Sequence, residues 1–236
     1  MDLNTESAAV YDSSRYEQPS VTVDVVIFSL VEEDLKMLLV KREKLPFANM
    51  WAIPGAFVGI EESLEDAAAR ALAEETGVND VYTEQLYTFG EPQRDPRTRV
   101  ITIAYFALVP HDAVRHEPGR ETTETRWFSV FDLPNLAFDH DDIVAYALTR
   151  LRYKLEYSSV GFQLLPDQFT LTELQRAYET ILSEKLDKRN FRRKILSADI
   201  LAETGEKKQD GEGRPAKLYR YRDDAVAEVK TRRLFP

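Results

Sequence analysis

An arginine and two adjacent glutamates stand at helical spacing in residues 56–78, which read AFVGIEESLEDAAARALAEETGV. On a helix, residues three and four apart share a face, so Arg70 would lie beside Glu74. Adjacent carboxylates are hard oxygen ligands of the kind with which Mg²⁺ bridges a protein to a substrate phosphate. The pattern indicates a site for a phosphate-bearing ligand, and Glu74 and Glu75 are the expected ligands of a weakened metal site.

The same helix lacks an acid where a third one would complete the site. Ala71 lies three residues before Glu74 and four before Glu75. Its side chain has no oxygen, so it can neither bind a cation nor accept a proton, and loss of such a group costs about 10²–10⁴ in rate. We therefore expect a pocket that binds its ligand without efficient cleavage, with no catalytic residue and no required cofactor.

Other side chains are expected to complete this pocket because guanidinium groups suit phosphate and aromatic rings suit a base or ribose. The predicted ligand-binding residues are Arg42, Phe57, Glu62, Arg70, Glu74, Glu75, Arg94, Arg97, Arg99 and Trp127. Taken singly, the arginines and aromatic rings outside residues 61–77 fit packing or a solvated surface better than a binding role. The histidines, His111, His116 and His140, stand in polar sequence without ligand spacing and are interpreted as surface residues.

The elements that must position these side chains follow from hydrophobic period and capping residues. Apolar, β-branched runs predict strands at 21–30, 37–41, 81–89, 99–109 and 124–130. Ser63 can cap a helix over 64–76, which Gly77 can end with a positive φ. A second helix is expected over 141–156. The first part of the chain is thus of the α+β class.

Composition limits the kinds of protein that the chain can be. Its 236 residues are 43% hydrophobic and 31% charged, with a net charge of −10 and no cysteine. Disulfides and thiolate metal sites are therefore excluded. The sequence also has no apolar run of about 18 residues, the length that would suggest a membrane span. A cytoplasmic protein is expected. Carboxylates dominate before residue 151 and cations slightly outnumber them after it, which suggests two modules with different partners.

The last part of the chain has the pattern of a winged helix-turn-helix. A helix capped by Thr170 precedes a basic helix capped by Asp187, and strands at 200–204 and 217–222 flank a Gly-rich basic loop. The alternative is a small helical interaction domain with a solvated basic face. The predicted DNA-binding residues are Thr170, Thr172, Lys188, Arg189, Asn190, Arg192, Arg193, Lys194, Lys207, Lys208, Arg214 and Lys217.

Residues 56–78 resemble the Nudix box, in which a glycine and a glutamate precede Arg-Glu-aliphatic-x-Glu-Glu-x-Gly-aliphatic. The matching residues are Glu62, Arg70, Leu72, Glu74, Glu75, Gly77 and Val78. The chain departs from the box at Ala56, which is next to Gly55, and at Ala71. The resemblance implies an α/β/α sandwich whose relatives hydrolyse nucleoside diphosphates linked to another group.

A Nudix-like domain followed by a winged helix resembles the NrtR family of Nudix-related transcriptional regulators of NAD metabolism. The segments GRPAKLYR at 213–220 and LPDQFTLTELQ at 165–175 carry the likeness. It implies a homodimeric repressor of NAD-biosynthesis genes that binds a palindromic operator in double-stranded DNA, with ADP-ribose or a related nucleotide as the releasing effector. The expected organisation is a mobile arm at 1–20, a ligand-sensing domain at 21–157 and a DNA-binding domain at 158–236.

Two other functions fit the same residues. The chain would be a working hydrolase of ADP-ribose or a similar nucleoside diphosphate sugar if its appended domain served dimerisation. It would regulate sugar catabolism if the pocket had changed its ligand. Turnover of ADP-ribose with Mg²⁺ separates the enzyme from the sensor.

Overall fold

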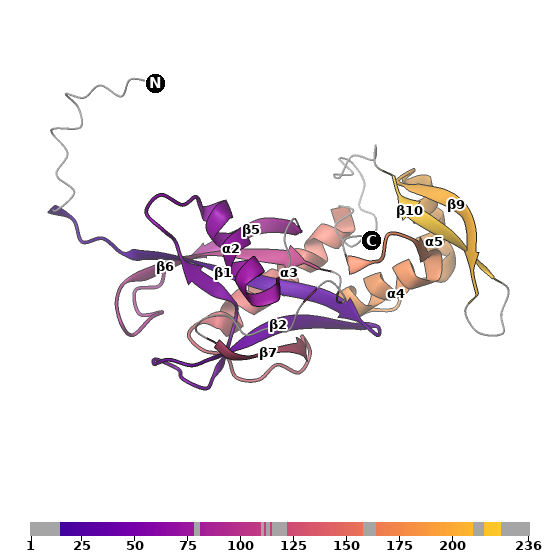
Figure 1. Cartoon of the computed structure of the whole chain (residues 1–236). Helices are drawn as coiled ribbons and strands as arrows, with labels where there is room; N and C mark the ends of the chain where they lie inside the picture. The colour runs from indigo at the N-terminus through magenta and orange to yellow at the C-terminus, as the bar shows by residue number, and fades with distance from the viewer. Residues whose placement is uncertain are drawn as a thin grey trace, which may run out of the picture.

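The computed structural model describes residues 15–77, 81–109, 111, 114, 122–157, 164–209 and 215–222. A seven-stranded mixed sheet fills the first part of the chain, and a smaller sheet with two helices follows (Figure 1). The large sheet contains β1 (Ser20–Val31), β2 (Asp34–Arg42), β3 (Trp51–Ala52), β4 (Gly55–Phe57), β5 (Tyr82–Phe89), β6 (Val100–Leu108) and β7 (Thr122–Ser129). The five predicted strands are confirmed. The predicted mobile arm lies outside the described residues up to residue 14.

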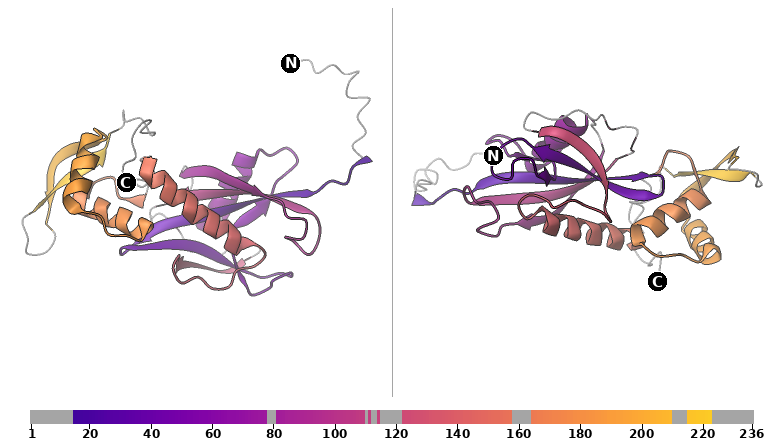
Figure 2. Two further views of the ribbon diagram at one scale, coloured as in Figure 1. Left: turned by 180° about the vertical axis from the view of Figure 1, so that it is seen from behind. Right: turned by 90° about the horizontal axis from the view of Figure 1, so that it is seen from below.

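The centre of the large sheet is buried on both faces. Its order is β3-β2-β1-β6-β5, with β1 and β6 parallel, while β4 pairs with β1 and β7 with β2. Side chains alternate along a strand, so Val25 and Ile27 pack with α2 (Leu64–Thr76), whereas Val26 and Phe28 pack with α3 (His140–Tyr157). The two helices cover opposite faces (Figure 2), which makes an α/β/α sandwich.

The helix that carries the box acids begins and ends where its capping residues predict. The Ser63 hydroxyl accepts a hydrogen bond from the backbone N–H of Asp66, and Gly77 ends α2 with a φ of 70°. Glycine adopts this left-handed conformation without the steric cost that a Cβ atom brings. The caps fix the length of α2 and therefore the place of its last turn, where Glu74 and Glu75 lie.

The β1–β2 hairpin ends in a two-residue turn of unusual composition. Glu32 and Glu33 have φ values of 50° and 64°, a conformation for which such turns usually employ Asn-Gly. The turn docks on α4 (Leu171–Leu182). Arg176 forms an ion pair of 2.8 Å with the Glu33 carboxylate, and the Thr180 hydroxyl donates to the Glu33 carbonyl at 3.0 Å. These contacts offset part of the backbone strain in the turn.

The last part of the chain has the helix and strand order of a winged helix. Its elements are β8 (Phe169–Thr170), α4, α5 (Lys188–Ser197), β9 (Leu201–Lys208) and β10 (Ala216–Tyr221), and β10 lies between β8 and β9. The predicted capping box is present, because Thr170 accepts from the Glu173 N–H and the Glu173 carboxylate accepts from the Thr170 N–H. Asp187 caps α5 in the same way through the Asn190 N–H.

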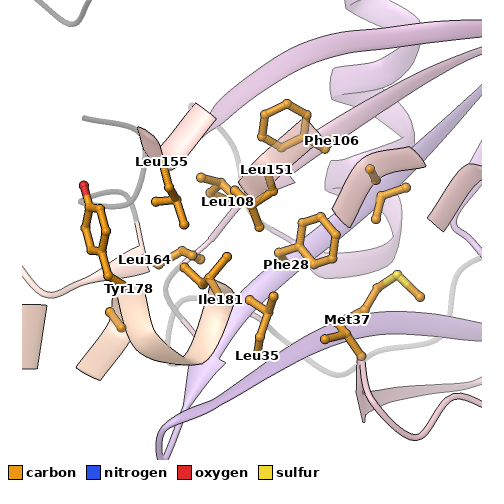
Figure 3. Close-up of a cluster of buried hydrophobic side chains, with 14 of the residues drawn as sticks. Phe28, Leu35, Met37, Phe106, Leu108, Leu151, Leu155, Leu164, Tyr178 and Ile181 are labelled. Carbon is orange, nitrogen blue, oxygen red and sulfur yellow. The ribbon is translucent and has the colours of Figure 1, made fainter. Parts of the chain in front are cut away.

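One hydrophobic cluster continues from the large sheet into the helices that follow it. Leu35 of β2 and Leu155 of α3 belong to the same buried cluster as Leu164, Tyr178 and Ile181 (Figure 3). The Nε of Arg152 on α3 also donates to the carbonyl of Ile181 at 3.0 Å. The two parts of the chain are therefore packed together by apolar contacts as well as by the polar contacts of the hairpin turn.

None of the described helices has the length and apolar character needed to cross a membrane.

The boundary predicted after residue 157 falls at the end of α3, and residues 158–163 lie outside the described part of the chain. That boundary stays a prediction.

Replacing Ile181 by alanine should destabilise both parts of the protein together. The side chain is fully buried in the shared cluster, so its truncation should lower the free energy of unfolding by about 2–5 kcal/mol. Denaturant unfolding followed by far-ultraviolet circular dichroism should show one transition at a lower midpoint. Ile60→Ala removes a fully exposed side chain and is the matched control, with an expected change within about 0.5 kcal/mol. Two separate transitions, only one of them shifted, would contradict the shared core.

Candidate functional site

A cavity of about 390 Å³ opens beside β1, the β3–β4 segment, the end of α2 and the start of α3. Its volume lies in the range of roughly 300–1,000 Å³ that is typical of small-molecule sites. Seven of the ten predicted ligand-binding residues line this cavity: Arg42, Phe57, Arg70, Glu74, Glu75, Arg94 and Arg97. The structure thus brings together residues from positions 42 to 97 of the sequence.

Several polar or aromatic residues that sequence reasoning missed also line the cavity. They are Thr22, Asp24, Asp95, Thr122, Phe138 and His140. A signal existed for Asp24, which is the single acid within the apolar run of residues 21–31. The sequence carries no comparable signal for Phe138 or His140, because the places of both side chains depend on how the segment at the start of α3 packs.

The floor of the cavity is a buried cluster of opposite charges. The Arg94 guanidinium donates to both oxygens of Asp139, at 2.8 and 2.6 Å, and its Nη2 lies 3.6 Å from the Asp24 carboxylate. The Arg94 side chain is only 4% exposed, so these carboxylates supply the pairing that a buried charge requires. Arg94 therefore fixes the start of α3 against β1.

His140 is buried, and its interpretation as a surface residue was wrong. Its Nδ1 accepts a hydrogen bond of 2.9 Å from the backbone N–H of Ile53, and its Nε2 lies 3.9 Å from Asp24 Oδ1. An acceptor at Nδ1 requires the neutral ring with its proton on Nε2. Burial lowers the pKa of His140 below its ordinary value, although the nearby Asp24 and Asp139 act in the opposite direction.

Gly55 permits a close approach of the β3–β4 segment to β1. A Cβ atom at this position would lie 2.4 Å from Asp24 Oδ1 and 2.6 Å from the Val23 carbonyl oxygen. Backbone atoms cannot yield to such a contact, so a larger residue would push the segment away from the floor of the cavity. Glycine at 55 therefore helps to set the depth of the cavity.

Arg70 holds the segment before α2 in place. Its Nε and Nη2 each donate to one oxygen of Glu62 at 2.8 Å, and Nη2 also donates to the Phe57 carbonyl at 3.0 Å. Hydrogen bonds from Arg70 and from the Gly59 backbone lower the pKa of Glu62 to about 2. Glu62 thus fixes the position of Arg70. The Arg70 Nη1 lies farther, at 3.8 Å, from Oε1 of Glu74.

Ala71 and the two box acids have different surroundings near the end of α2. Ala71 is buried in the cluster between α2 and the sheet, while Glu74 and Glu75 line the cavity and Glu75 accepts from the Thr122 hydroxyl at 3.3 Å. Within the described ranges, no three His, Cys, Asp or Glu side chains are grouped to hold a metal ion.

The remaining predicted ligand-binding residues have different environments. Arg97 makes a bidentate pair with Asp95, at 3.0 and 2.7 Å, on the wall of the cavity. Arg99 is exposed and donates to the Gly90 carbonyl at 2.6 Å, outside the lining of the cavity. Trp127 packs against the α2 side of the sheet, with its ring 5.5 Å from that of His111. The structure therefore does not bring Glu62, Arg99 or Trp127 into the lining of the cavity.

The basic helix α5 presents cations on the side that is away from its core. Phe191 and Ile195 are buried, whereas Lys188, Arg189 and Arg193 are exposed. Asn190 is also exposed, and its Oδ1 accepts from Arg193 Nη2 at 2.9 Å. Arg192 and Lys194 are half-buried, and Arg192 Nη2 donates to the Thr172 hydroxyl of α4 at 3.1 Å.

The wing contributes further cations beside α5. Lys207 is exposed on β9, Lys208 forms an ion pair of 2.6 Å with Glu173, and Lys217 forms one of 2.9 Å with Glu203. Thr170 is buried with its hydroxyl held in the α4 cap, so its place is that of a capping residue. The predicted contact of Arg214 lies outside the described residues. The other predicted DNA-binding side chains come from α4, α5 and the two wing strands.

Family models match both parts of the chain. The model of the NUDIX domain matches residues 20–147, and that of the NrtR DNA-binding winged helix domain matches residues 161–221. An ADPR responsive transcriptional repressor NtrR of Acinetobacter baylyi is 39% identical over 227 residues, which cover 94% of this chain and 90% of that protein. The similarity therefore extends across both parts of the chain.

Two solved structures of one similar protein contain DNA in one case and ADP ribose in the other. The crystal structure of Shewanella oneidensis NrtR complexed with a 27mer DNA is similar with a TM-score of 0.81 and 37% identity, covering 91% of this chain and 99% of that one. The NUDIX domain of the same protein complexed with ADP ribose is similar with a TM-score of 0.56 and 37% identity, covering 63% of this chain and 98% of that domain.

The free energy of unfolding should fall as the pH drops from about 7 to 5, and His140 should contribute to this slope. Its pKa in the folded chain lies below the ordinary value, so the unfolded chain takes up the proton first. The stability from the neutral buried ring is complete above about pH 7 and is lost progressively as the pH falls from the ordinary pKa near 6.5 through the lower pKa of the folded chain.

His140→Asn tests this contribution, because asparagine offers an oxygen near the position of Nδ1 but does not titrate. Denaturant unfolding at several pH values should give a shallower slope for this variant than for the unmodified chain, whatever its absolute stability. Equal slopes would show that His140 is not held neutral.

Proposed function

We propose that this chain, which belongs to the NrtR family of Nudix-domain transcriptional regulators, is a DNA-binding repressor that ADP-ribose releases from its operator. One observation carries the proposal. The part of the chain that carries a cavity lined by four arginines shares its hydrophobic core with a basic winged helix. The genes that it represses are those of NAD biosynthesis, and ADP-ribose reports NAD turnover.

The chemistry of the cavity supports a diphosphate ligand that carries a sugar and a base. Arg42, Arg70, Arg94 and Arg97 line it, and guanidinium groups match phosphate oxygens in geometry as well as in charge. Phe57 lines the cavity and is 53% exposed, so its ring offers an aromatic face to a base or ribose. The similarity to a repressor described as ADPR responsive, and to a NUDIX domain complexed with ADP ribose, supports this ligand.

The proposed sensor does not depend on turnover of its ligand. Ala71 offers no oxygen at the position where the Nudix box has an acid, and it contributes instead to the packing of α2 on the sheet. Glu74 and Glu75 remain as ligands of a weakened metal site, which the binding of ADP-ribose does not require. A sensor gains from this arrangement because it retains its signal instead of destroying it.

The proposed DNA contacts follow from the position of the cations. The exposed side of α5, with Arg189, Asn190 and Arg193, enters the major groove, while Lys207, Lys208 and Lys217 of the wing lie along phosphates. A homodimer would place two such helices on half-sites about 34–36 Å apart in a palindromic operator. ADP-ribose releases the DNA if it binds more tightly to the arrangement in which these helices no longer match the half-sites.

A labelled fragment from upstream of the NAD-biosynthesis genes should bind the full chain, and ADP-ribose should weaken that binding. Fluorescence anisotropy is expected to show a roughly 5- to 150-fold loss of affinity at saturating ADP-ribose, the usual size of allosteric coupling. Chromatography of the same samples with Mg²⁺ should show ADP-ribose intact. Rapid formation of AMP, together with indifference to every promoter fragment, would favour the hydrolase instead.

Arg193→Ala should weaken operator binding by roughly 5- to 150-fold, the equivalent of one lost base contact. Arg150→Ala removes the same charge from an exposed position on α3 and is the matched control, with an expected change below about twofold. The affinity of the unmodified chain should fall steeply as salt rises, because its cations displace counterions from DNA. Equal affinities of the two variants would show that α5 is not the reading helix.

A further inference from the structure

Phe138 stands in the cavity wall with an uncommon backbone conformation. Its φ is 56°, in the left-handed region that is strained for a residue other than glycine. It directly precedes Asp139, which is fixed by Arg94, and its ring packs edge-on against Phe47 at a centroid distance of 4.7 Å. Two anchors therefore hold the ring in a position that the backbone alone would not favour.

The ring of Phe138 lies close to two guanidinium groups from distant parts of the chain. Its centroid is 4.8 Å from Cζ of Arg42, at the end of β2, and 5.8 Å from Cζ of Arg97, in the loop before β6. All three residues line the cavity. A cation over an aromatic face is attracted to the ring within about 6 Å, so Phe138 links both arginines to the same wall.

An aromatic ring positions a guanidinium in a different way from a carboxylate. Arg94 and Arg70 are held by the carboxylates of Asp139 and Glu62, which neutralise the charge that they orient. The ring of Phe138 carries no net charge, so it orients the Arg42 guanidinium without adding an opposite charge of its own, and the Nε of Arg42 donates to the carbonyl of Pro46 at 3.1 Å. An oriented positive charge on a cavity wall is suited to an anionic ligand.

We propose that Phe138 is a positioning residue for the diphosphate of the ligand, because it holds the guanidinium group of Arg42 on one wall of the cavity. The inference rests on the proposed function, in that the ligand is taken to be a diphosphate. Phe138 acts mainly through Arg42, which lies closer to the ring, whereas Arg97 is also fixed by its ion pair with Asp95.

Two variants of the full chain separate this role from simple packing. Phe138→Leu keeps an apolar side chain but removes the π-face, whereas Phe138→Tyr keeps the face. Titration calorimetry with ADP-ribose should show a dissociation constant roughly 5- to 30-fold larger for Phe138→Leu, the size of one desolvated cation–π contact. Phe138→Tyr should stay within about twofold of the unmodified chain. Operator affinity without ADP-ribose should be the same for all three proteins, which reports that they are folded alike.

A double-mutant cycle with Arg42→Gln identifies the group through which Phe138 acts. In the Arg42→Gln background, Phe138→Leu should cost much less than it does in the unmodified chain, because the main charge that it positions is gone. Penalties that simply add would mean that the ring contacts the ligand itself and would overturn the proposal. If the unmodified chain binds ADP-ribose and Phe138→Leu binds it with the same affinity, this inference alone is overturned. Failure of the unmodified chain to bind ADP-ribose would overturn the proposed function as well.

Discussion

The hairpin of β1 and β2 takes part in both halves of the molecule, and much of the remaining geometry depends on how it is anchored. Asp24 and Arg42, towards its open end, line the cavity. Its turn contacts α4 through Glu33, and Leu35 enters the hydrophobic cluster that α4 shares. Because close-packed interiors transmit strain, the hairpin offers a route by which a displacement of the cavity wall would reach α4 in the proposed function.

The charged side chains of the cavity are held in place in different ways. Arg94 and Arg70 tie separate segments together through carboxylates, and His140 adds a neutral hydrogen bond to the β3–β4 segment. Arg42 is oriented by an aromatic ring. Ala71 packs α2 against the sheet and offers no oxygen to a cation. In the proposed function, such a site binds an anion without depending on its cleavage.

The elements of this fold could be predicted from local signals, since apolar alternation marks β1 and β6 and capping residues mark α2 and α4. The site could be predicted only in part. His140 stands among acids in the sequence, and its burial arises from contact with Ile53, which is far away along the chain. Trp127 pairs with Leu38 in the β2–β7 register, which turns its ring to the α2 face. A shift of one residue would reverse that face, and no local pattern fixes such a register.

In this proposal one packed body joins ligand binding to DNA release, and thermodynamic linkage provides the sharpest test of that coupling. The affinity for ADP-ribose should be measured by titration calorimetry on the full chain, with and without a saturating operator duplex. We expect weaker ADP-ribose binding in the presence of DNA, by the same factor by which ADP-ribose weakens operator binding. Equal affinity for ADP-ribose in the two states would show that the two sites are not coupled.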